Sequence, residues 1–470
     1  MSKVAILALL TLAGCASAPG YQAPAVVMPA TFRETRDTVV RVPTSSALAS
    51  DSLAGPSLGD TTLTRLIQEA LRANLDVRTA EARVRGARSA RTEAALDFAP
   101  TVTFAGGYTR ERLSSAGFPP GFSFPDQSIW DAGFDASWEL DLFGRVRRNV
   151  QAQGAFVAVN QEDLRNVQVS LTAELARSYF DLRGAQEQLV VAHRNADNQG
   201  RTLQLTRERL QAGRGTAFDT ERAQAQLSTT LATVPVLEAR VRQAEYQIAV
   251  LTGRPPAALS GELDAIAPLP AFPTTVVVAS PDSVVRRRPD VSAAERQLAL
   301  ERALVGAAKA DYLPRVTVGG SAGYTSTALD ALGDSGTFRY AVGPVLSWPA
   351  LNLGRVKARV DQSRAREDEA RAQYNQTVLL ALQDVEGALV RYRTSRSRVE
   401  QIRAAAAASE RAADLARLRF TGGVADFLQV LDAERTQLEA QDQLAQSRTE
   451  AATAYAALYK ALGGSWPLGQ

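Results

Sequence analysis

Few residues of this 470-residue chain could carry out catalysis or hold a metal ion. His193 is the only histidine and Cys15 the only cysteine, which leaves little for a metal site or a Ser–His catalytic set. No glycine-rich phosphate-binding loop opens a helix after a predicted strand. We therefore expect no catalytic residues, no cofactor and no metal site, and predict that the protein is not an enzyme. His193 lies within a predicted helix and is expected at the surface.

Charged residues with a regular spacing occur near the C-terminus, in the segment LQVLDAER. Leu428, Asp432 and Arg435 are four and three residues apart, so in a helix they share one face. Taken alone, Asp432 and Arg435 predict an exposed ion pair that contributes a few tenths of a kcal/mol. The spacing by itself assigns no function to this pair.

The N-terminus, MSKVAILALLTLAGCASAPG, has the pattern of an export signal. One lysine precedes an apolar run of about ten residues, which is too short to cross a bilayer as a helix. Leu12-Ala13-Gly14-Cys15 resembles a bacterial lipobox, in which cleavage leaves the cysteine as the acylated first residue. We predict a signal peptide at 1–14 and lipidation of Cys15. The alternative is an ordinary signal peptide with an incidental cysteine.

Charge indicates no strongly acidic or basic partner. The net charge is +3, and the charged residues, 22% of the chain, alternate in sign along predicted helices. We read these residues as solvated helix faces and expect no nucleic-acid binding. Three segments lack a helical or strand period and are assigned as connections: a lipidated extended tether at 15–59, a proline-rich linker at 254–280 and a tail at 465–470.

The predicted elements include an unusual joint, in which a helix is followed directly by a strand. Pro289 fits a first helical position, and Asp290 places a carboxylate at the positive end of the helix dipole. The helical pattern ends at Leu313-Pro314 because proline cannot continue it. Residues 315–325 then alternate between apolar and other side chains, which predicts a strand with one apolar face.

The same joint occurs earlier in the chain, which indicates a tandem duplication. Several anchors recur in one order at an offset of 214 or 210 residues. They are Asp76/Asp290, Pro100/Pro314, Trp138/Trp348, Arg209/Arg419 and Gly213/Gly423. We predict a first repeat at 60–253 and a second at 281–464, and not a short-period solenoid.

Each repeat is predicted to contain two strands and one long helical hairpin. The strands are expected at about 101–111, 129–141, 315–325 and 337–348, and Pro344 predicts a bulge or bend in the last of them. The second strand is the clearest, with aromatic residues at both ends of an 11-residue apolar stretch, the length of a tilted transmembrane strand. The proline-free run at 145–212 predicts one helix of about 100 Å, and Gly213 is expected to turn the chain.

Four strands cannot close a membrane barrel, because open strand edges are not tolerated in lipid. Two, three or four copies would give eight, twelve or sixteen strands, and periodicity does not choose among them. The alternative is a water-soluble sandwich with helical hairpins attached. The export signal, the lipobox and the bilayer-length strands together favour the shared barrel.

Three segments resemble the outer-membrane factor (TolC-like) family, and the lipobox points to its NodT/OprM-type lipoprotein branch. They are RRRPDVSAAERQLALERALVGAAKADYLPRV, the pair LFGRV and LNLGRV, and GGVADFLQVLDAERTQL. The resemblance covers about residues 56–464. It implies a mainly α fold with a transmembrane β part, in which a homotrimer shares a twelve-stranded barrel in the lipid of the outer membrane and extends α-helical hairpins into the periplasm.

The resemblance also implies roles for particular residues. Asp432 matches an aspartate that constricts the periplasmic end of the tunnel, with Leu428 and Arg435 on the same helix face. The hairpin tips, marked by Arg209, Gly213, Arg419 and Gly423, match the region that docks the adaptor. This sequence carries Ala425 and Gln429 where some members have further charged gate residues, so its gate depends on fewer contacts.

The function implied by the resemblance is passive export. The family forms the exit duct of tripartite efflux systems, and receives drugs or other small molecules from a periplasmic adaptor and an inner-membrane transporter, often of the proton-driven RND type. Two alternatives stay open: a duct for metal ions or for type I protein secretion, and a non-conducting structural envelope lipoprotein. Only two methionines and one histidine occur, which argues weakly against a metal-ion duct.

Overall fold

The computed structural model describes residues 28–35, 39–41, 60–114, 116, 119, 121, 124–270, 272, 276–278 and 280–464. Cys15, the predicted signal peptide and the tail at 465–470 lie outside these residues. The chain forms two compact units. The described part of the first falls within 83–161 and 293–374, and that of the second within 28–82, 162–292 and 375–464. Each unit thus takes residues from both predicted repeats.

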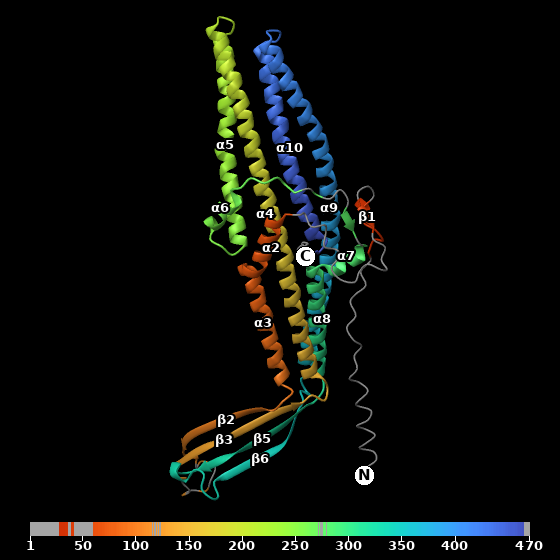
Figure 1. Cartoon of the computed structure of the whole chain (residues 1–470). Coiled ribbons are helices and arrows are strands. Elements are labelled where there is room, and N and C mark those ends of the chain that lie inside the picture. The colour runs from red at the N-terminus through yellow and green to blue at the C-terminus, as the bar shows by residue number, and fades with distance from the viewer. Residues whose placement is uncertain are drawn as a thin grey trace. The chain divides into compact units, whose positions relative to one another are not determined.

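The first unit contains a four-stranded antiparallel sheet (Figure 1). Its strands are β2 (Thr101–Glu111), β3 (Gln127–Leu140), β5 (Arg315–Ser326) and β6 (Phe338–Ser347). They pair in the order β2-β3-β5-β6, so β2 and β6 are the edges of the sheet within the described residues. A short 3-10 helix, η4 (Leu329–Ala331), follows β5.

The register of this sheet gathers large apolar residues on one face. Phe104 pairs with Phe134, Phe134 with Ala322, and Ala322 with Tyr340. Directly paired residues of an antiparallel sheet point to the same side, so these four lie in one row across the sheet. Phe104, Phe134 and Tyr340 are 66%, 57% and 74% exposed, and the centroids of the two phenylalanine rings are 5.4 Å apart. The sheet therefore has an uncovered aromatic face.

The opposite face of the sheet is polar. The carboxylate of Asp131 on β3 accepts hydrogen bonds from Thr325 Oγ1 at 2.7 Å and from Arg339 Nη2 at 2.6 Å. Asp135 and Ser137 follow at even spacing and therefore share this side. The alternation of apolar and polar residues predicted for each strand thus gives the sheet one apolar face and one polar face.

The bulge expected at Pro344 is absent. Val318 pairs with Pro344 in an uninterrupted register from Arg315↔Ser347 to Tyr324↔Phe338. The physical reason is that a proline lacks a nitrogen hydrogen to donate but occupies one position in the strand like any other residue, so the register with β5 can continue through it. The prediction of a bulge was therefore wrong.

Long helices make up most of the chain. Four of them have residues in both units: α3 (Leu75–Leu96), α4 (Arg145–Gln211), α8 (Pro289–Ala310) and α9 (Leu353–Thr421). The second unit also contains α2 (Thr61–Ala73), α5 (Ala217–Leu251), α7 (Pro281–Arg287) and α10 (Phe427–Ala461). Helices α4 and α5 form one hairpin, and α9 and α10 form the other (Figure 1).

Helix starts follow the local sequence. Asp60 caps α2, because its Oδ1 accepts the backbone N–H of Leu63 at 2.9 Å. Its other carboxylate oxygen accepts the O–H of Tyr179 on α4 at 2.7 Å. Burial of the ring, together with this bond to Asp60, raises the pKa of Tyr179 to about 12, so the phenol stays protonated at neutral pH.

The core of the second unit lies where its helices meet. Leu175 and Phe180 of α4, Ile248 of α5 and Leu458 of α10 are 0–1% exposed. The ring of Phe272, which lies in the predicted linker, packs edge-on against Phe180 with centroids 5.3 Å apart. The linker therefore contributes apolar area to this core.

Two segments expected to be without regular structure contain short elements. The predicted linker includes η3 (Pro256–Leu259), α6 (Ser260–Leu263) and β4 (Val276–Val278), and the predicted tether includes η2 (Arg33–Thr35) and β1 (Val39–Arg41). Strands β1 and β4 pair in parallel. Because the two paired segments are more than 200 residues apart, no local period in the sequence indicates this pairing.

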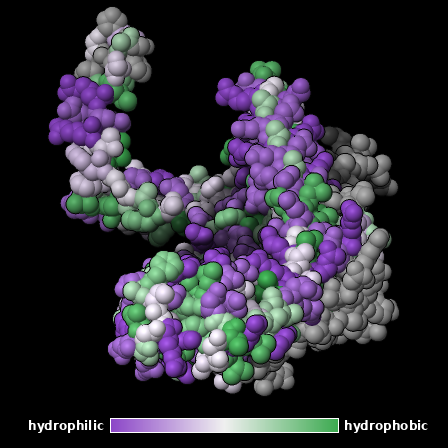
Figure 2. Space-filling view, turned by 90° about the horizontal axis from the view of Figure 1, so that it is seen from above, coloured by the Kyte–Doolittle hydropathy of each residue, from purple (hydrophilic) through white to green (hydrophobic). Residues whose placement is uncertain are grey.

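Surface chemistry is mixed. On the face drawn in Figure 2, hydrophilic residues predominate and hydrophobic residues form smaller groups among them. Among the described residues, no helix has both the length and the apolar character that crossing a membrane requires.

Candidate functional site

The residues expected to form a gate lie on an exposed face at the beginning of α10. This helix starts where Asp426 Oδ1 caps the N–H of Gln429 at 3.0 Å. Arg435 Nη2 donates to Asp432 Oδ1 at 3.0 Å, and the two side chains are 60% and 66% exposed. Leu428 is 53% exposed. The three predicted residues therefore share one accessible face, and within one chain the ion pair is solvated.

Behind this face lies a buried carboxylate that the sequence analysis did not single out. The side chain of Glu434 is 4% exposed, and its Oε1 accepts Thr202 Oγ1 of α4 at 2.7 Å and Arg417 Nε of α9 at 2.8 Å. Glu434 thus ties α10 to both neighbouring helices. A signal exists in the sequence, because Phe427, Val430, Glu434, Gln437 and Gln441 are spaced three and four residues apart and are all buried.

Between its apolar clusters, the contact between α4 and α10 contains polar pairs. Asn195 Nδ2 donates to Gln441 Oε1 at 2.9 Å, and Gln188 Nε2 donates to Asp442 Oδ1 at 2.8 Å. Gln199 on α4 is 3% exposed, and neither atom of its amide has a protein partner. These polar contacts add directed hydrogen bonds to the apolar packing of α10 against α4.

The two hairpin tips have the same backbone turn. Gly213 and Gly423 have φ values of 69° and 76°, a conformation that favours glycine. The N–H of Arg214 donates to the carbonyl of Arg209 at 2.8 Å, and the N–H of Val424 donates to the carbonyl of Arg419 at 3.0 Å. Both turns are Schellman motifs, which end α4 and α9.

The two tip arginines have different surroundings. The Arg209 guanidinium lies 4.3 Å from the ring centroid of Phe420 and donates to the Phe420 carbonyl at 2.7 Å, which links the first tip to the second. Arg419 is exposed, and its side chain has no hydrogen bond or ion pair with any residue that the structure describes. The structure therefore gives these two predicted tip residues different contacts.

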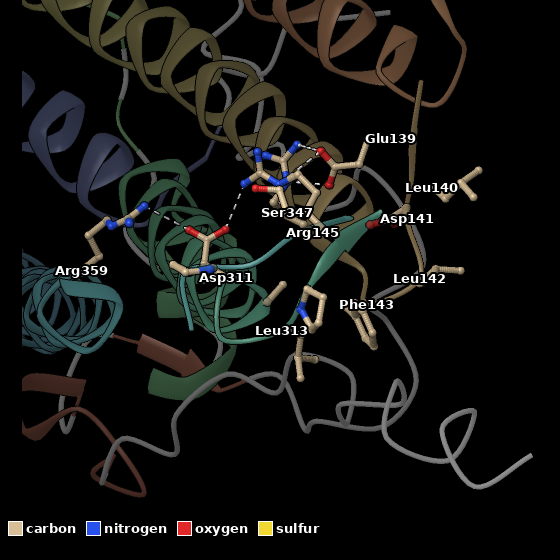
Figure 3. Close-up of a pocket in the computed structure, with 14 residues that line it drawn as sticks. Glu139, Leu140, Asp141, Leu142, Phe143, Arg145, Asp311, Leu313, Ser347 and Arg359 are labelled. Carbon is tan, nitrogen blue, oxygen red and sulfur yellow. Dashed lines mark hydrogen bonds and ion pairs between the residues drawn. The ribbon is translucent and has the colours of Figure 1, made fainter. Parts of the chain in front are cut away.

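The first unit has a charged cavity of about 160 Å³ where β3 and β5 meet α4 and α8 (Figure 3). Arg145 donates to both carboxylate oxygens of Glu139, at 2.8 and 2.6 Å. Asp311 accepts from Arg315 at 3.3 Å and from Arg359 at 3.4 Å. Since both carboxylates are paired with guanidinium groups, we interpret this cluster as a brace for the joint between helices and strands.

His193 is exposed, in agreement with its prediction as a surface residue. In the part of the chain that the structure describes, no group of three or more His, Cys, Asp or Glu side chains is arranged to hold a metal ion.

The chain is similar to known proteins over most of its length. The model of the family described as "Outer membrane efflux protein" matches residues 66–254 and 281–464. Nodulation protein T of Rhizobium leguminosarum bv. trifolii is 28% identical over 462 residues, which cover 97% of this chain and 96% of that protein. The pyoverdine export outer membrane protein OpmQ of Pseudomonas aeruginosa is 31% identical over 421 residues, covering 87% and 86%.

A solved structure shows the same likeness in three dimensions. The outer-membrane channel OprN is 37% identical, with a TM-score of 0.86. The match covers 96% of this chain and 100% of that chain.

Proposed function

The chain belongs to the outer membrane efflux protein family, and from this premise we propose that it is the exit duct of a tripartite efflux system. The predicted TolC-like fold and outer-membrane location, with helices in the periplasm, are confirmed. The protein is an outer-membrane efflux channel. Members of this family are transporters rather than enzymes, and we propose that this chain catalyses no reaction.

The observation that carries the proposal is the uncovered four-stranded sheet. One of its faces is aromatic, and its edge strands β2 and β6 each have a single neighbour within the described residues. Each unpaired backbone group in lipid costs several kcal/mol, so the edges must be joined to further strands. Three copies joined edge to edge give twelve strands, an even number in the range of bacterial barrels.

The proposed partners supply what the chain lacks. The sequence contains no nucleotide-binding motif, so the energy for export comes from another protein. We assign that role to an inner-membrane transporter, of the RND type, that is coupled through a periplasmic adaptor. The duct then conducts drugs or other small molecules passively.

The proposed periplasmic gate is the exposed face of α10. Around a threefold axis, three copies of Asp432 form a ring of like charge that favours cations. Arg435, 3.0 Å from Asp432, offsets part of the repulsion, and Leu428 adds an apolar collar. Glu434, on the buried side of the same helix, positions this face through α4 and α9.

The proposed docking surface for the adaptor is the pair of hairpin tips. Gly213 and Gly423 allow tight turns that expose backbone groups at the ends of both hairpins. Arg209 holds the two tips together through Phe420, so they form one surface in each chain. Arg419 borders the same surface.

The proposed membrane attachment has two components, the barrel and a lipid on Cys15. The lipobox supports acylation of Cys15 after removal of residues 1–14, and 15–59 then tethers the lipid to the folded part. We propose that the chain is divided into repeats at 60–253 and 281–464, joined by the linker at 254–280.

Planar-bilayer recording tests the proposed function. Purified full-length protein is expected to produce discrete single-channel openings, and a preparation unfolded by heat serves as the control. Single-channel conductance would support the proposal that the protein is an exit duct. A folded, oligomeric preparation that never conducts would instead indicate the structural envelope lipoprotein.

A further inference from the structure

The second unit holds a cavity of about 730 Å³ that shares no residue with the proposed gate or with the hairpin tips. One wall is formed by residues 266–270 and Phe272 of the predicted linker, and the other walls come from α4, α9 and α10. This volume lies within the range of about 300–1,000 Å³ that is typical of small-molecule sites in proteins. The cavity is therefore large enough to hold a ligand.

The linker wall of the cavity is held at both ends. Before it, the carbonyl of Ala265 accepts Arg183 Nη1 of α4 at 2.6 Å. After it, the Phe272 ring packs against the ring of Tyr455 on α10, with centroids 5.4 Å apart. Two prolines between these contacts restrict the backbone angles of the wall. The wall is thus in place before a ligand binds, which lowers the entropy that binding costs.

Apolar side chains line the cavity, and two of them are open to solvent. Ile266 of the linker is 62% exposed, and Val190 of α4 is 43% exposed. Phe272 and Val399 belong to the same lining. Because covering exposed apolar surface is favourable in water, this lining suits a ligand with an apolar body.

The charged residues around this lining are mainly cationic. They are Arg396 and Arg403 of α9 and Arg448 of α10, against Glu187 and Glu400. Arg448 Nη1 lies 2.5 Å from Glu187 Oε1, so these two charges offset each other. Two arginines and one glutamate remain, which leaves the cavity with an excess of positive charge.

Arg403 is the guanidinium group that a ligand can reach. It is exposed, and its side chain has no hydrogen bond or ion pair with any residue in the described part of the chain. Arg396, Val399 and Arg403 are spaced three and four residues apart, so they share one face of α9. A guanidinium offers a planar fork of N–H donors that matches a carboxylate or a sulfonate.

We propose that this cavity binds an amphipathic organic anion. Its carboxylate or sulfonate pairs with Arg403, and its apolar body lies against Ile266 and Val190. An organic cation of the same size meets repulsion from the excess positive charge, and a neutral molecule leaves Arg403 without a partner. A bound anion joins the linker to α4 and α9. This site goes beyond the proposed export function, because it requires neither conductance nor an adaptor.

Equilibrium dialysis of full-length protein in lipid nanodiscs tests the site. Decanoate serves as a probe for a fatty acid and 2-naphthoate as a probe for an aromatic acid, so the two measurements separate these sources of the same chemistry. Nanodiscs avoid detergent micelles, and empty nanodiscs measure uptake of the probes by lipid. Wild-type protein is expected to bind at least one of the two anions in excess of empty nanodiscs. It should bind the neutral 2-naphthamide more weakly than 2-naphthoate.

Three variants of exposed residues locate the binding. Arg403→Ala is expected to weaken binding of the anion roughly fivefold, the effect of one partly solvated ion pair. Ile266→Asp should weaken it as well, because it places a carboxylate in the apolar wall. Glu400→Gln should strengthen it, because it removes a negative charge from the cavity. Arg411→Ala, an exposed arginine of α9 outside the cavity, is the matched control and should bind like the wild type.

The opposite effects of Arg403→Ala and Glu400→Gln distinguish anion recognition from a general loss of structure, which would weaken binding in both variants. The proposal is overturned if neither anion binds in excess of empty nanodiscs. It is also overturned if Arg403→Ala binds the anion as tightly as Arg411→Ala does, or if 2-naphthamide binds as tightly as 2-naphthoate. Each of these results leaves the proposed exit duct untouched, since single-channel conductance is measured separately.

Discussion

At the scale of single residues, α10 carries acidic side chains with different tasks. Asp432 is 66% exposed and forms an ion pair with Arg435, so in the proposed gate its charge is available to passing ions. Glu434, two residues on, is 4% exposed and accepts bonds from α4 and α9. Two residues correspond to about 200° around a helix, which places the two carboxylates on opposite sides.

Replacing Asp432 tests the charged ring. Asp432→Ala is expected to reduce the preference of the channel for K⁺ over Cl⁻, because a ring of carboxylates selects cations. Reversal potentials under a KCl gradient measure the preference. Glu238→Ala, an exposed acidic residue on α5, is the control. Unchanged selectivity in the Asp432 variant would place the constriction elsewhere.

A second residue-scale prediction concerns Glu434. Glu434→Ala leaves Thr202 and Arg417 without their partner and is expected to cost about 2 kcal/mol of stability, since Arg417 stays partly solvated. Thermal unfolding followed by circular dichroism gives the shift. Glu439→Ala, on the same helix and 62% exposed, should have little effect. Equal unfolding temperatures for the two variants would show that Glu434 does not stabilise the contact of α10 with α4 and α9.

At the scale of elements, the local period of the sequence sets which side chains share a face of a strand or helix. Which neighbour each face contacts depends on how the elements pair. Strand β3 alone predicts an apolar and a polar side. The register with β2 and β5 joins its apolar side into one aromatic surface, while Asp131 binds Arg339 on the other. We expect Trp130, Phe134, Trp138, Tyr340 and Leu346 to face lipid, and Asp135 and Ser137 the lumen.

This assignment predicts an asymmetry between neighbouring residues. Phe134→Arg is expected to impair assembly, because an arginine on the lipid face near the bilayer midplane costs about 2–4 kcal/mol. Asp135→Arg, one residue away on the other face, should assemble. The yield of trimer in outer-membrane fractions is the measurement. If both variants assemble equally well, the facing is wrong.

Helix α5 contains a carboxyl group that should make stability depend on pH. Glu245 is fully buried, and burial raises its pKa although Arg242 Nη1 lies 2.9 Å from it. A raised folded-state pKa gives stability that is complete below the unfolded pKa and is lost as pH rises through the folded pKa.

Glu245→Gln therefore should raise the unfolding temperature at neutral pH and flatten its dependence on pH above the unfolded value. Unfolding midpoints measured from acidic to neutral pH test this, with wild type as reference. If the unfolding temperature of the variant changes with pH as steeply as that of the wild type, another group causes the pH dependence.

At the scale of the whole molecule, the proposed assembly has two independent attachments to the membrane. Cys15→Ser removes the lipid but leaves the aromatic face of the sheet, so the variant is expected to insert and form trimers still. Mass spectrometry of the mature N-terminus should show an acylated Cys15 in the wild type. An unmodified N-terminus at another residue would refute lipidation.

Several properties could be read from the sequence because they depend on neighbours along the chain. The alternation at 101–111, the proline-free run after Arg145 and the recurring anchors report local backbone preference and duplication. The turn glycines and the helix cap at Asp60 likewise depend only on residues nearby in the sequence. These features were enough to predict the helices, the strands and the family resemblance.

The tertiary structure alone decided which faces meet. Glu434 lies on α10, but its partner Thr202 is 232 residues away, and no local period connects them. The same holds for Arg209 with Phe420, and for β1 with β4. The structure also corrected the bulge expected at Pro344, because the register between β5 and β6 continues through this residue. Periodicity fixes the side of an element on which a residue lies, whereas its partner depends on packing between elements distant in the chain.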